Sequence, residues 1–363
     1  MREGLLADQR LRVAGTQQRQ VATRDAHHFL HQVVHLPSIA EITAPPRVTS
    51  VDVARRAGVS QSTVSLVLSG KARGRISART EEAVRAAAAE LGYRPNVAAR
   101  ALRTGVARSV ALVVPDITNP FFGRVLRGAQ RAAQEASYTV VLVDIGNNRA
   151  WEAASVEALL AGPADGLLLF EADLPPGTSE HAIQIEMAPG GEFPVVRLDV
   201  EAGVDHALDH LLELGHTKIG HVASNFDAPT FDLRAARIAA RLGPVPTVMA
   251  PFTFEGAKVA AAAMLDEDVT AVFCDDDILA GGLYLAARER GVSIPGDLSV
   301  VGFDDLDFAR VLAPPLTTVA VDAEGLGALA FSALAADLAG ESVPPEQVMP
   351  VSLTVRESTA PPA

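Results

Sequence analysis

Apolar residues in the segment 48–94 recur at the three- and four-residue spacing of amphipathic helices. The first predicted helix starts at Thr49, and Asp52 stands three positions later, where cap and carboxylate can bond the free N–H groups of a helix start. Its apolar face consists of Val53, Ala54 and Ala57. Gly58 ends the helix after about two turns, because glycine readily adopts the positive φ of a helix terminus.

A second helix follows at once, with Ser60 as its N-cap. Its buried stripe consists of Val64, Val67 and Leu68, which leaves Gln61, Ser62, Ser65 and Leu66 facing outward. Two short helices joined by a tight turn form a helix-turn-helix, in which the outward face of the second helix meets the major groove of DNA. An ordinary helical hairpin would show the same pattern, so the flanking sequence decides between the two.

The flanks add a third helix. Ser77 caps it, residues 78–90 form it, and Gly92 and Pro95 stop it, so that three helices can enclose a small core. Residues 96–103 could form a further helix, but eight residues are marginal for a helix in water. We expect this segment to fold only on a partner.

From residue 109 onward, apolar runs alternate with alanine-rich helical segments, which is the pattern of parallel strands joined by crossover helices. The runs predicted as strands are 110–116, 138–144, 166–171, 193–199, 218–224, 270–276 and 298–305. Each ends in polar or acidic residues. Open parallel sheets bind ligands beyond the carboxyl ends of their strands, so a site is expected there. Ordinary polar loops after buried strands are the alternative explanation.

Charge divides the chain into a basic and an acidic part. Residues 47–108 hold 12 Lys and Arg against 4 Asp and Glu, a net charge of +8, whereas the whole chain carries −13. The overlap of this basic segment with the predicted helix-turn-helix indicates phosphate contact, and the acidic remainder should repel DNA.

Composition narrows the class further. The 363 residues suffice for a small headpiece and about two further domains. Cys274 is the single cysteine, which excludes an internal disulfide and fits a reducing cytoplasm. No apolar run reaches the roughly 18 residues of a membrane helix, and residues 1–46 show no secretory signal. We expect residues 1–46 to be a disordered extension or the product of a misplaced start codon, and their histidines to be solvated.

Residues 48–109 resemble the headpiece and hinge of the LacI/GalR transcriptional repressors, with VARRAGVSQSTVSLVLSG as the helix-turn-helix and PNVAARAL as the hinge. The resemblance implies that Gln61, Ser62 and Leu66 face bases, and that Ser60, Thr63 and Ser65 contact phosphates or the DNA backbone. Relatives often carry Arg or another polar residue at the position of Leu66, so here this position can read only shape or a thymine methyl group.

The hinge resemblance assigns two further DNA-binding residues, Asn96 and Leu102. Leu102 aligns with an apolar wedge that enters the minor groove and kinks the operator. Its alternative is a buried helix residue, but Ala98 and Ala99 offer almost no core to bury it.

The rest of the chain, to about residue 357, resembles the family's effector-binding core, which is related to periplasmic sugar-binding proteins; PDITNPFF, TAVFCDDDILAGG and VVGFDDLDFARVLAPPLTTV are its landmarks. By position, the effector-binding residues are Phe121, Phe122, Thr230, Arg234, Phe252, Asp276 and Asp304. Aromatic faces stack on a sugar or base, Arg forks onto a carboxylate or vicinal hydroxyls, and Asp accepts from a hydroxyl or amine. Core packing is an equal alternative for Phe121 and Phe122, and Asp277 is expected to cap a helix.

Two connections are predicted to be shorter than in relatives, after Leu198 and after Arg234, which would make the cavity smaller, more open or lost. The predicted fold is α/β: a small all-α helix-turn-helix headpiece followed by a two-subdomain, periplasmic-binding-protein-like core with parallel sheets. Its expected parts are a tail (1–46), the headpiece (47–94), a hinge (95–108) and the core (109–363).

Four classes of function compete. The sequence favours a cytoplasmic, homodimeric repressor that binds a pseudo-palindromic operator and is controlled by a sugar-like or nucleoside-like effector. The second class is a DNA-binding repressor that senses no small molecule or is regulated by a protein partner. A solute-binding protein is disfavoured by the headpiece. An enzyme is disfavoured because P-loop, GxGxxG, GxSxG and metal-ligand patterns are lacking; we assign no catalytic residue, cofactor, metal or membrane partner.

Overall fold

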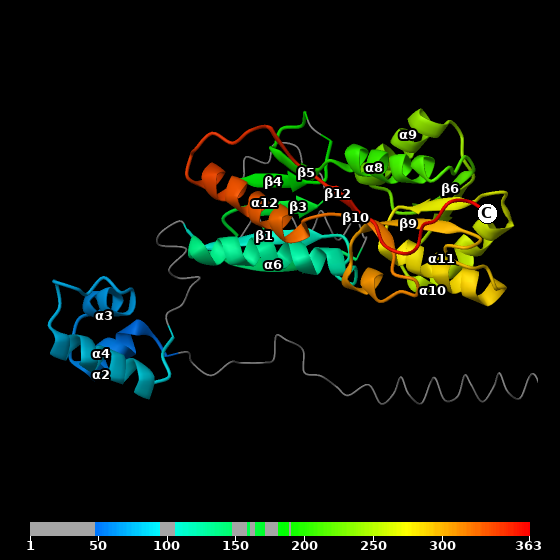
Figure 1. Ribbon diagram of the computed structural model, residues 1–363. Coiled ribbons are helices and arrows are strands. Elements are labelled where there is room, and N and C mark those ends of the chain that lie inside the picture. Colours follow the sequence, from blue (N-terminus) through cyan, green and yellow to red (C-terminus); the bar gives the residue numbers. More distant parts are fainter. Residues whose placement is uncertain (1–47, 95–105, 147–157, 160–163, 171–180, 189) are drawn as a thin grey trace, which may run out of the picture. The chain divides into compact units, whose positions relative to one another are not determined.

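The computed structural model describes residues 48–94, 106–146, 158–159, 164–170, 181–188 and 190–363. These residues fall in two compact units that divide between residues 95 and 96 (Figure 1). The first unit contains the headpiece and the second contains the core.

The headpiece is built from the three predicted helices, α2 (Ser50–Ala57), α3 (Gln61–Leu68) and α4 (Ala78–Glu90). The predicted caps are confirmed: Thr49 and Asp52 form a reciprocal capping box, Gly58 is left-handed with φ +66°, and the Ser60 hydroxyl accepts from the Thr63 N–H at 3.2 Å. The fully buried side chains of Val53, Val64 and Val84, one from each helix, form the centre of the small core. Each contributes about 1.5–3 kcal/mol on burial.

The core consists of two sheets, each with six strands among the described residues. Sheet A has the order β11-β5-β4-β3-β1-β2 and is wholly parallel. Its strands are β1 (Ser109–Val114), β2 (Thr139–Asp144), β3 (Leu167–Phe170), β4 (Ala182–Ile185), β5 (Val195–Leu198) and β11 (Glu346–Met349). Helices α6 (Pro120–Glu135) and α12 (Ala323–Leu338) pack against each other beside this sheet (Figure 1).

Sheet B has the order β12-β10-β9-β8-β6-β7 and is parallel except for the β10–β12 pair. Its strands are β6 (Ile219–Ser224), β7 (Thr247–Ala250), β8 (Ala271–Cys274), β9 (Ser299–Asp304), β10 (Thr317–Ala320) and β12 (Ser352–Thr354). Helices α8 (Val200–Glu213) and α9 (Pro229–Leu242) cover one face, and α10 (Phe254–Ala261) and α11 (Asp277–Arg290) the other (Figure 1).

The chain passes repeatedly between the halves of the core. Strand β5 of sheet A leads into α8 beside sheet B, β10 of sheet B leads into α12 beside sheet A, and β11 of sheet A leads into β12 of sheet B. The carboxyl ends of several parallel strands from both sheets therefore face one region between the halves, where the site lies.

All seven predicted strands are present, but the sequence reading missed β4, β7, β10, β11 and β12. These strands span three or four residues, and β7, β11 and β12 are partly exposed, so they lack the long apolar run of a buried strand. The connection after Leu198 is as short as expected, since α8 begins at Val200, but sheet A gains β4 before β5. After Arg234, α9 continues to Leu242, and β7 follows at Thr247.

The contact between α6 and α12 allows a direct test of close helix packing. A Cβ at Gly128 of α6 would overlap the Glu324 backbone of α12, whereas a Cβ at Gly123 of the same helix meets nothing within 4 Å. We predict that Gly128→Ala lowers the free energy of unfolding by about 1–3 kcal/mol through overpacking. Gly123→Ala should raise it by roughly 0.5–1 kcal/mol, because alanine is the better helix former. Equal effects in urea unfolding would contradict the packing argument.

Candidate functional site

The first candidate site is the outward face of α3. Gln61 and Ser62 are exposed, and Ser65 and Leu66 are half-buried. The polar side chains already have local partners: Gln61 Nε2 donates to Ser50 Oγ at 2.9 Å, and the Ser60 and Ser62 hydroxyls lie 2.7 Å apart. On binding, a nucleic acid would replace these exposed hydrogen bonds with hydrogen bonds to its own polar groups. Of the predicted DNA-binding residues, Asn96 and Leu102 lie outside the described residues.

A basic segment that runs from the end of α3 into α4 (71–79) adds residues that the sequence analysis did not single out. Arg55, Arg56 and Arg85 form ion pairs with Asp52, Glu90 and Glu81. Lys71, Arg73, Arg75 and Arg79 are different: within the described part of the chain, none has an acidic partner. All except Lys71 lie within seven residues of sequence, 73–79, so their clustering was visible in the sequence. Unpaired exposed cations beside a recognition helix suit phosphate contact.

The second candidate site is a cavity of about 620 Å³, its mouth included, between the two halves of the core. Its lining contains all seven residues predicted to hold an effector: Phe121, Phe122, Thr230, Arg234, Phe252, Asp276 and Asp304. It also contains residues that were not predicted: Pro115, Asp116, Asn119, Phe170, Glu186, Leu198, Phe226 and Phe231. Most of these lie at or just after the carboxyl end of a strand, so the strand-end signal could have found them. Glu186 was missed because β4, which precedes it, was missed.

Phenylalanine rings form the walls of the cavity. Phe121, Phe122 and Phe170 meet edge to face, with ring centroids 5.1–6.0 Å apart. Phe231 and Phe252 form a second pair with centroids 5.5 Å apart. The position of Phe121 is compatible with both core packing and effector binding. Its side chain is 7% exposed and belongs to the hydrophobic core, and it also lines the cavity.

Arg234 is the buried cation of the cavity, and its side chain comes from α9. It is 4% exposed, its guanidinium carbon lies 3.7 Å from the Phe303 ring centroid, and Nη1 donates to the Asp275 carbonyl. Its Nε has no hydrogen-bond partner among the described residues. A buried N–H without an acceptor is costly, so a ligand oxygen at this point would gain a strong bond.

Asp276 and Asp304 face one another in the cavity. Asp276 Oδ2 accepts from Asn119 Nδ2 at 3.1 Å, and Asp276 and Asp304 both line the cavity. Burial, followed by the negative charge of Asp304, raises the pKa of Asp276 well above its usual value. Burial likewise raises the pKa of Asp304, although Arg234 acts in the opposite direction. The pair therefore holds a proton more tightly than two separate carboxyls would.

Glu186 is the third buried carboxyl of the cavity. Its Oε1 accepts from the Leu198 N–H at 2.7 Å, its Oε2 lies 3.4 Å from Thr230 Oγ1, and its backbone is left-handed with φ +59°. Burial raises the pKa of Glu186 to about 7, against the opposing effects of the Leu198 N–H and Arg234. Part of this carboxyl therefore remains protonated at neutral pH.

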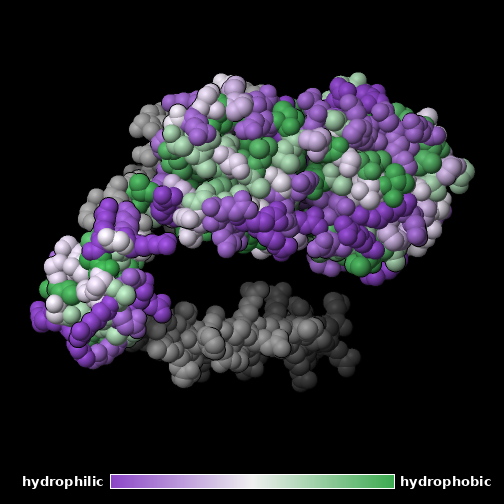
Figure 2. Space-filling view, turned by 60° about the vertical axis from the view of Figure 1, so that its left-hand side comes forward, coloured by the Kyte–Doolittle hydropathy of each residue, from purple (hydrophilic) through white to green (hydrophobic). Residues whose placement is uncertain are grey.

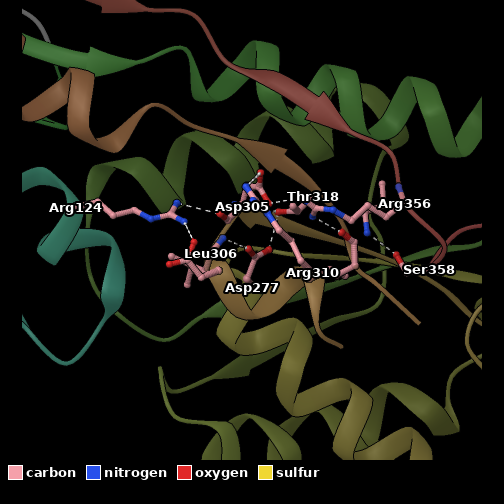
Figure 3. Close-up of polar contacts among 11 residues, drawn as sticks. Arg124, Asp277, Asp305, Leu306, Arg310, Thr318, Arg356 and Ser358 are labelled. Atoms are coloured by element: carbon pink, nitrogen blue, oxygen red, sulfur yellow. Dashed lines mark hydrogen bonds and ion pairs between the residues drawn. The ribbon is translucent and has the colours of Figure 1, made fainter. Parts of the chain in front are cut away.

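The prediction for Asp277 was wrong. The residue that caps α11 is Asp276, whose Oδ1 accepts from the Ile278 N–H at 2.6 Å. The Asp277 carboxylate instead accepts from the Leu306 N–H at 2.7 Å and from Thr318 Oγ1 at 2.6 Å (Figure 3). Sequence could not separate two adjacent carboxylates at the start of one helix. The described residues contain no cluster of His, Cys, Asp and Glu that could hold a metal ion.

A polar network beside the cavity joins the two halves. Arg124 of α6 donates to the Asp305 carbonyl at 2.9 Å and pairs with Asp307 at 2.7 Å (Figure 3). The Asp305 carboxylate pairs with Arg356 and lies 3.7 Å from Arg310. Asp304 and Asp305 both have positive φ, of 102° and 49°. This network holds the strained turn that carries Asp304 into the cavity.

The raised pKa of Glu186 predicts how stability depends on pH. Glu186 is protonated in both folded and unfolded chains well below its usual value of 4.5, so it has no differential effect there. Between pH 4.5 and about 7 the unfolded chain loses this proton while the folded chain keeps it, so the free energy of unfolding falls by about 3 kcal/mol over this range and stays lower above it. Glu186→Gln removes this cost.

We therefore predict that Glu186→Gln is more stable than the unaltered protein at pH 8, and that the difference shrinks towards pH 5. Urea unfolding across this range measures it. Glu192→Gln, at an exposed position in the same region, is the control and should show no such trend. A Glu186→Gln protein that is less stable at pH 8 would contradict the desolvation argument.

None of the described helices is long and apolar enough to cross a membrane. Comparison with known proteins adds the family. Residues 50–96 match the bacterial regulatory proteins of the lacI family, and residues 208–359 match a periplasmic binding protein-like domain. The HTH-type transcriptional repressor CytR of Escherichia coli K12 is 31% identical over 329 residues, which cover 86% of this chain and 96% of CytR. The ribose operon repressor of Haemophilus influenzae is 33% identical over 311 residues, covering 79% of this chain and 90% of that repressor.

Solved structures agree with these relatives. A Lac repressor dimer bound to operator and the anti-inducer ONPF superposes with a TM-score of 0.77 at 27% identity, covering 86% of this chain and 99% of that one. A LacI family regulator from Enterococcus faecalis with bound ribose superposes with a TM-score of 0.65 at 26% identity, covering 70% and 99%. The two matched domains, the relatives aligned over most of their length and the shared fold agree. The chain belongs to the lacI family of bacterial regulatory proteins.

Proposed function

We propose that this protein is a transcriptional repressor whose binding to operator DNA is controlled by a small polar effector in the core cavity. The observation that carries the proposal is the joint presence of a capped helix-turn-helix and a cavity lined by all seven sequence-predicted effector residues. A relative solved with bound ribose and another solved with cellobiose support a polar effector. The protein acts in the cytoplasm, where its operator is accessible.

The proposed domains are the headpiece at 47–94, the hinge at 95–108 and the core at 109–363. In the headpiece, Gln61, Ser62 and Leu66 read bases, while Ser60, Thr63 and Ser65 contact the DNA backbone. The basic segment 71–79 adds phosphate contacts, and Asn96 and Leu102 act in the hinge. In the core, Arg234, Asp276 and Asp304 bind polar groups of the effector, and the phenylalanine walls pack on its ring.

The proposed assembly is a homodimer that presents two headpieces to a pseudo-palindromic operator. One visible face of the core carries hydrophobic residues between hydrophilic ones (Figure 2). The edge strands β2 and β7 expose Val141 and Met249, and the neighbouring helix α10 exposes Phe254 and Val259. These apolar side chains suit burial against a second copy, and the Lac repressor dimer is a relative of known assembly.

Two headpiece variants separate the proposed roles. Arg73→Ala should weaken operator and random DNA equally and lower the slope of log affinity against log salt by about one, because it removes a phosphate contact. Gln61→Ala should cost about 1–3 kcal/mol on the operator and little on random DNA. Fluorescence anisotropy between low and physiological salt measures both. Arg85→Ala is the control, since its charge is already paired with Glu81. An Arg73→Ala loss confined to the operator would contradict the phosphate role.

Effector control is tested at Arg234. A metabolite that binds the cavity should raise the melting temperature and change operator affinity, and Arg234→Ala should weaken that binding by about 1.5–3 kcal/mol because a charged hydrogen bond is lost. Thr230→Val, which removes one hydroxyl and no charge, checks that the fold tolerates changes in the lining. If no metabolite in a broad screen changes either readout, the repressor that senses no small molecule replaces the proposal.

A further inference from the structure

The cavity contains more acid than base. Glu186, Asp276 and Asp304 are each at least 90% buried, and Arg234 is the corresponding buried cation among the described lining residues. Two further arginines lie nearby but are engaged elsewhere. Arg124 is held by Asp305 and Asp307, and Arg197 pairs with Glu346 at 2.6 Å. The three carboxyls therefore share one free counter-charge.

This imbalance has a physical cost in the unliganded protein. Buried carboxylates without a partner cation are destabilised, and the protein responds by holding protons on them. The raised pKa values of all three groups reflect that response. A ligand with positive charge would release those protons and supply the missing counter-charge, whereas an anion would add to the repulsion.

The walls of the cavity favour the same kind of ligand. Six phenylalanines line it: Phe121, Phe122, Phe170, Phe226, Phe231 and Phe252. Aromatic faces attract organic cations through the negative charge of the ring face, and they also cover the apolar face of a sugar ring. The Arg234 Nε–H has no acceptor among the described residues, so an oxygen on the ligand could satisfy it.

We infer that the effector is a small organic cation bearing oxygen acceptors, of the amino-sugar type, with its ammonium group among Glu186, Asp276 and Asp304 and an oxygen on Arg234. Glu186 is the residue that selects the charge. It touches the Leu198 N–H and Thr230 and lies in the field of Arg234 (α9), Asp304 (β9) and Arg197 (β5). The inference rests on the proposed function, because it names the ligand class of that same cavity.

Matched sugars that differ in charge at one substituent test the inference. Glucosamine, glucose and glucuronate form one series, and galactosamine, galactose and galacturonate form another. At pH 6.5, where the sugar amine is protonated, isothermal titration calorimetry should show at least one amine binding tenfold or more tightly than its neutral partner, and no uronate binding. Titration at this pH in two buffers of different ionisation enthalpy should show net proton release with the amine. Its affinity should rise as pH increases from about 5.5 towards 7, where Glu186 ionises.

Glu186→Gln supplies the residue-level test. It keeps the acceptor for the Leu198 N–H but removes the charge, so it should weaken the amine about tenfold, change a neutral sugar less than twofold, and reduce proton release. Glu192→Gln, which removes an exposed charge outside the cavity lining, should leave all three readouts unchanged. A cooperative melting transition at or above the temperature of the unaltered protein shows that the variant is folded.

Several results overturn the inference. The inference fails if a neutral sugar or a uronate binds more tightly than its amine partner. It also fails if an amine binds without proton release, or if no amine binds. A neutral or anionic ligand that releases the operator would overturn the charge selection and leave the repressor controlled by an effector. An operator complex that no ligand in any charge class disturbs would overturn effector control as well.

Discussion

Three consecutive buried aspartates at the start of α11 hold the core around its cavity. Asp275 accepts from His221 Nε2 and from the Ser224 N–H, which ties the end of β8 to β6. Asp276 caps α11 and bonds Asn119 at the start of α6, in the other half of the core. Asp277 holds the Leu306 N–H and the Thr318 hydroxyl, which fixes the turn after β9 against β10. Each carboxylate has directional protein donors, so their burial is compatible with a stable fold. The position of Asp304 in the cavity depends on this arrangement.

Charge is distributed so that the two units of the chain have different partners. The headpiece and hinge region carries +8 against −13 for the whole chain, and the cations of segment 71–79 lack acidic partners within the described part. Acidic residues of the core lie in its interior as well as on its surface, because the cavity contains three buried carboxyl groups. Long-range attraction therefore brings DNA to the headpiece and disfavours it on the core, while short-range contacts in a low-dielectric cavity discriminate among small molecules.

Local signals could be predicted from the sequence, and contacts between distant residues could not. The caps at Thr49, Ser60 and Ser77 and the seven predicted apolar strands depend on neighbours in the chain, so pattern and spacing suffice to find them. The strands β4 and β7 span four residues each and are set by pairing with other strands. The same limit explains Glu186: without β4, no rule pointed to its carboxyl. It also explains the exchange of roles between Asp276 and Asp277, because only the fold decides which carboxylate faces the helix start and which faces β10.

The start of α6 connects the cavity to the opposite half of the core. The first turn of α6 carries Phe121 and Phe122 in the cavity wall, and its N-cap Asn119 bonds Asp276 across the two halves. One turn further on, Arg124 bonds the Asp305 carbonyl of the opposite half. A ligand that exchanges these cross-contacts for its own changes the relative stability of open and closed arrangements of the core. Such a ligand shifts the population only by the difference in its affinity for the two arrangements. The buried hydrogen bond from Asn119 to Asp276 joins the two halves of the core, and both residues line the cavity. A ligand in the cavity therefore contacts the same two residues that hold the halves together.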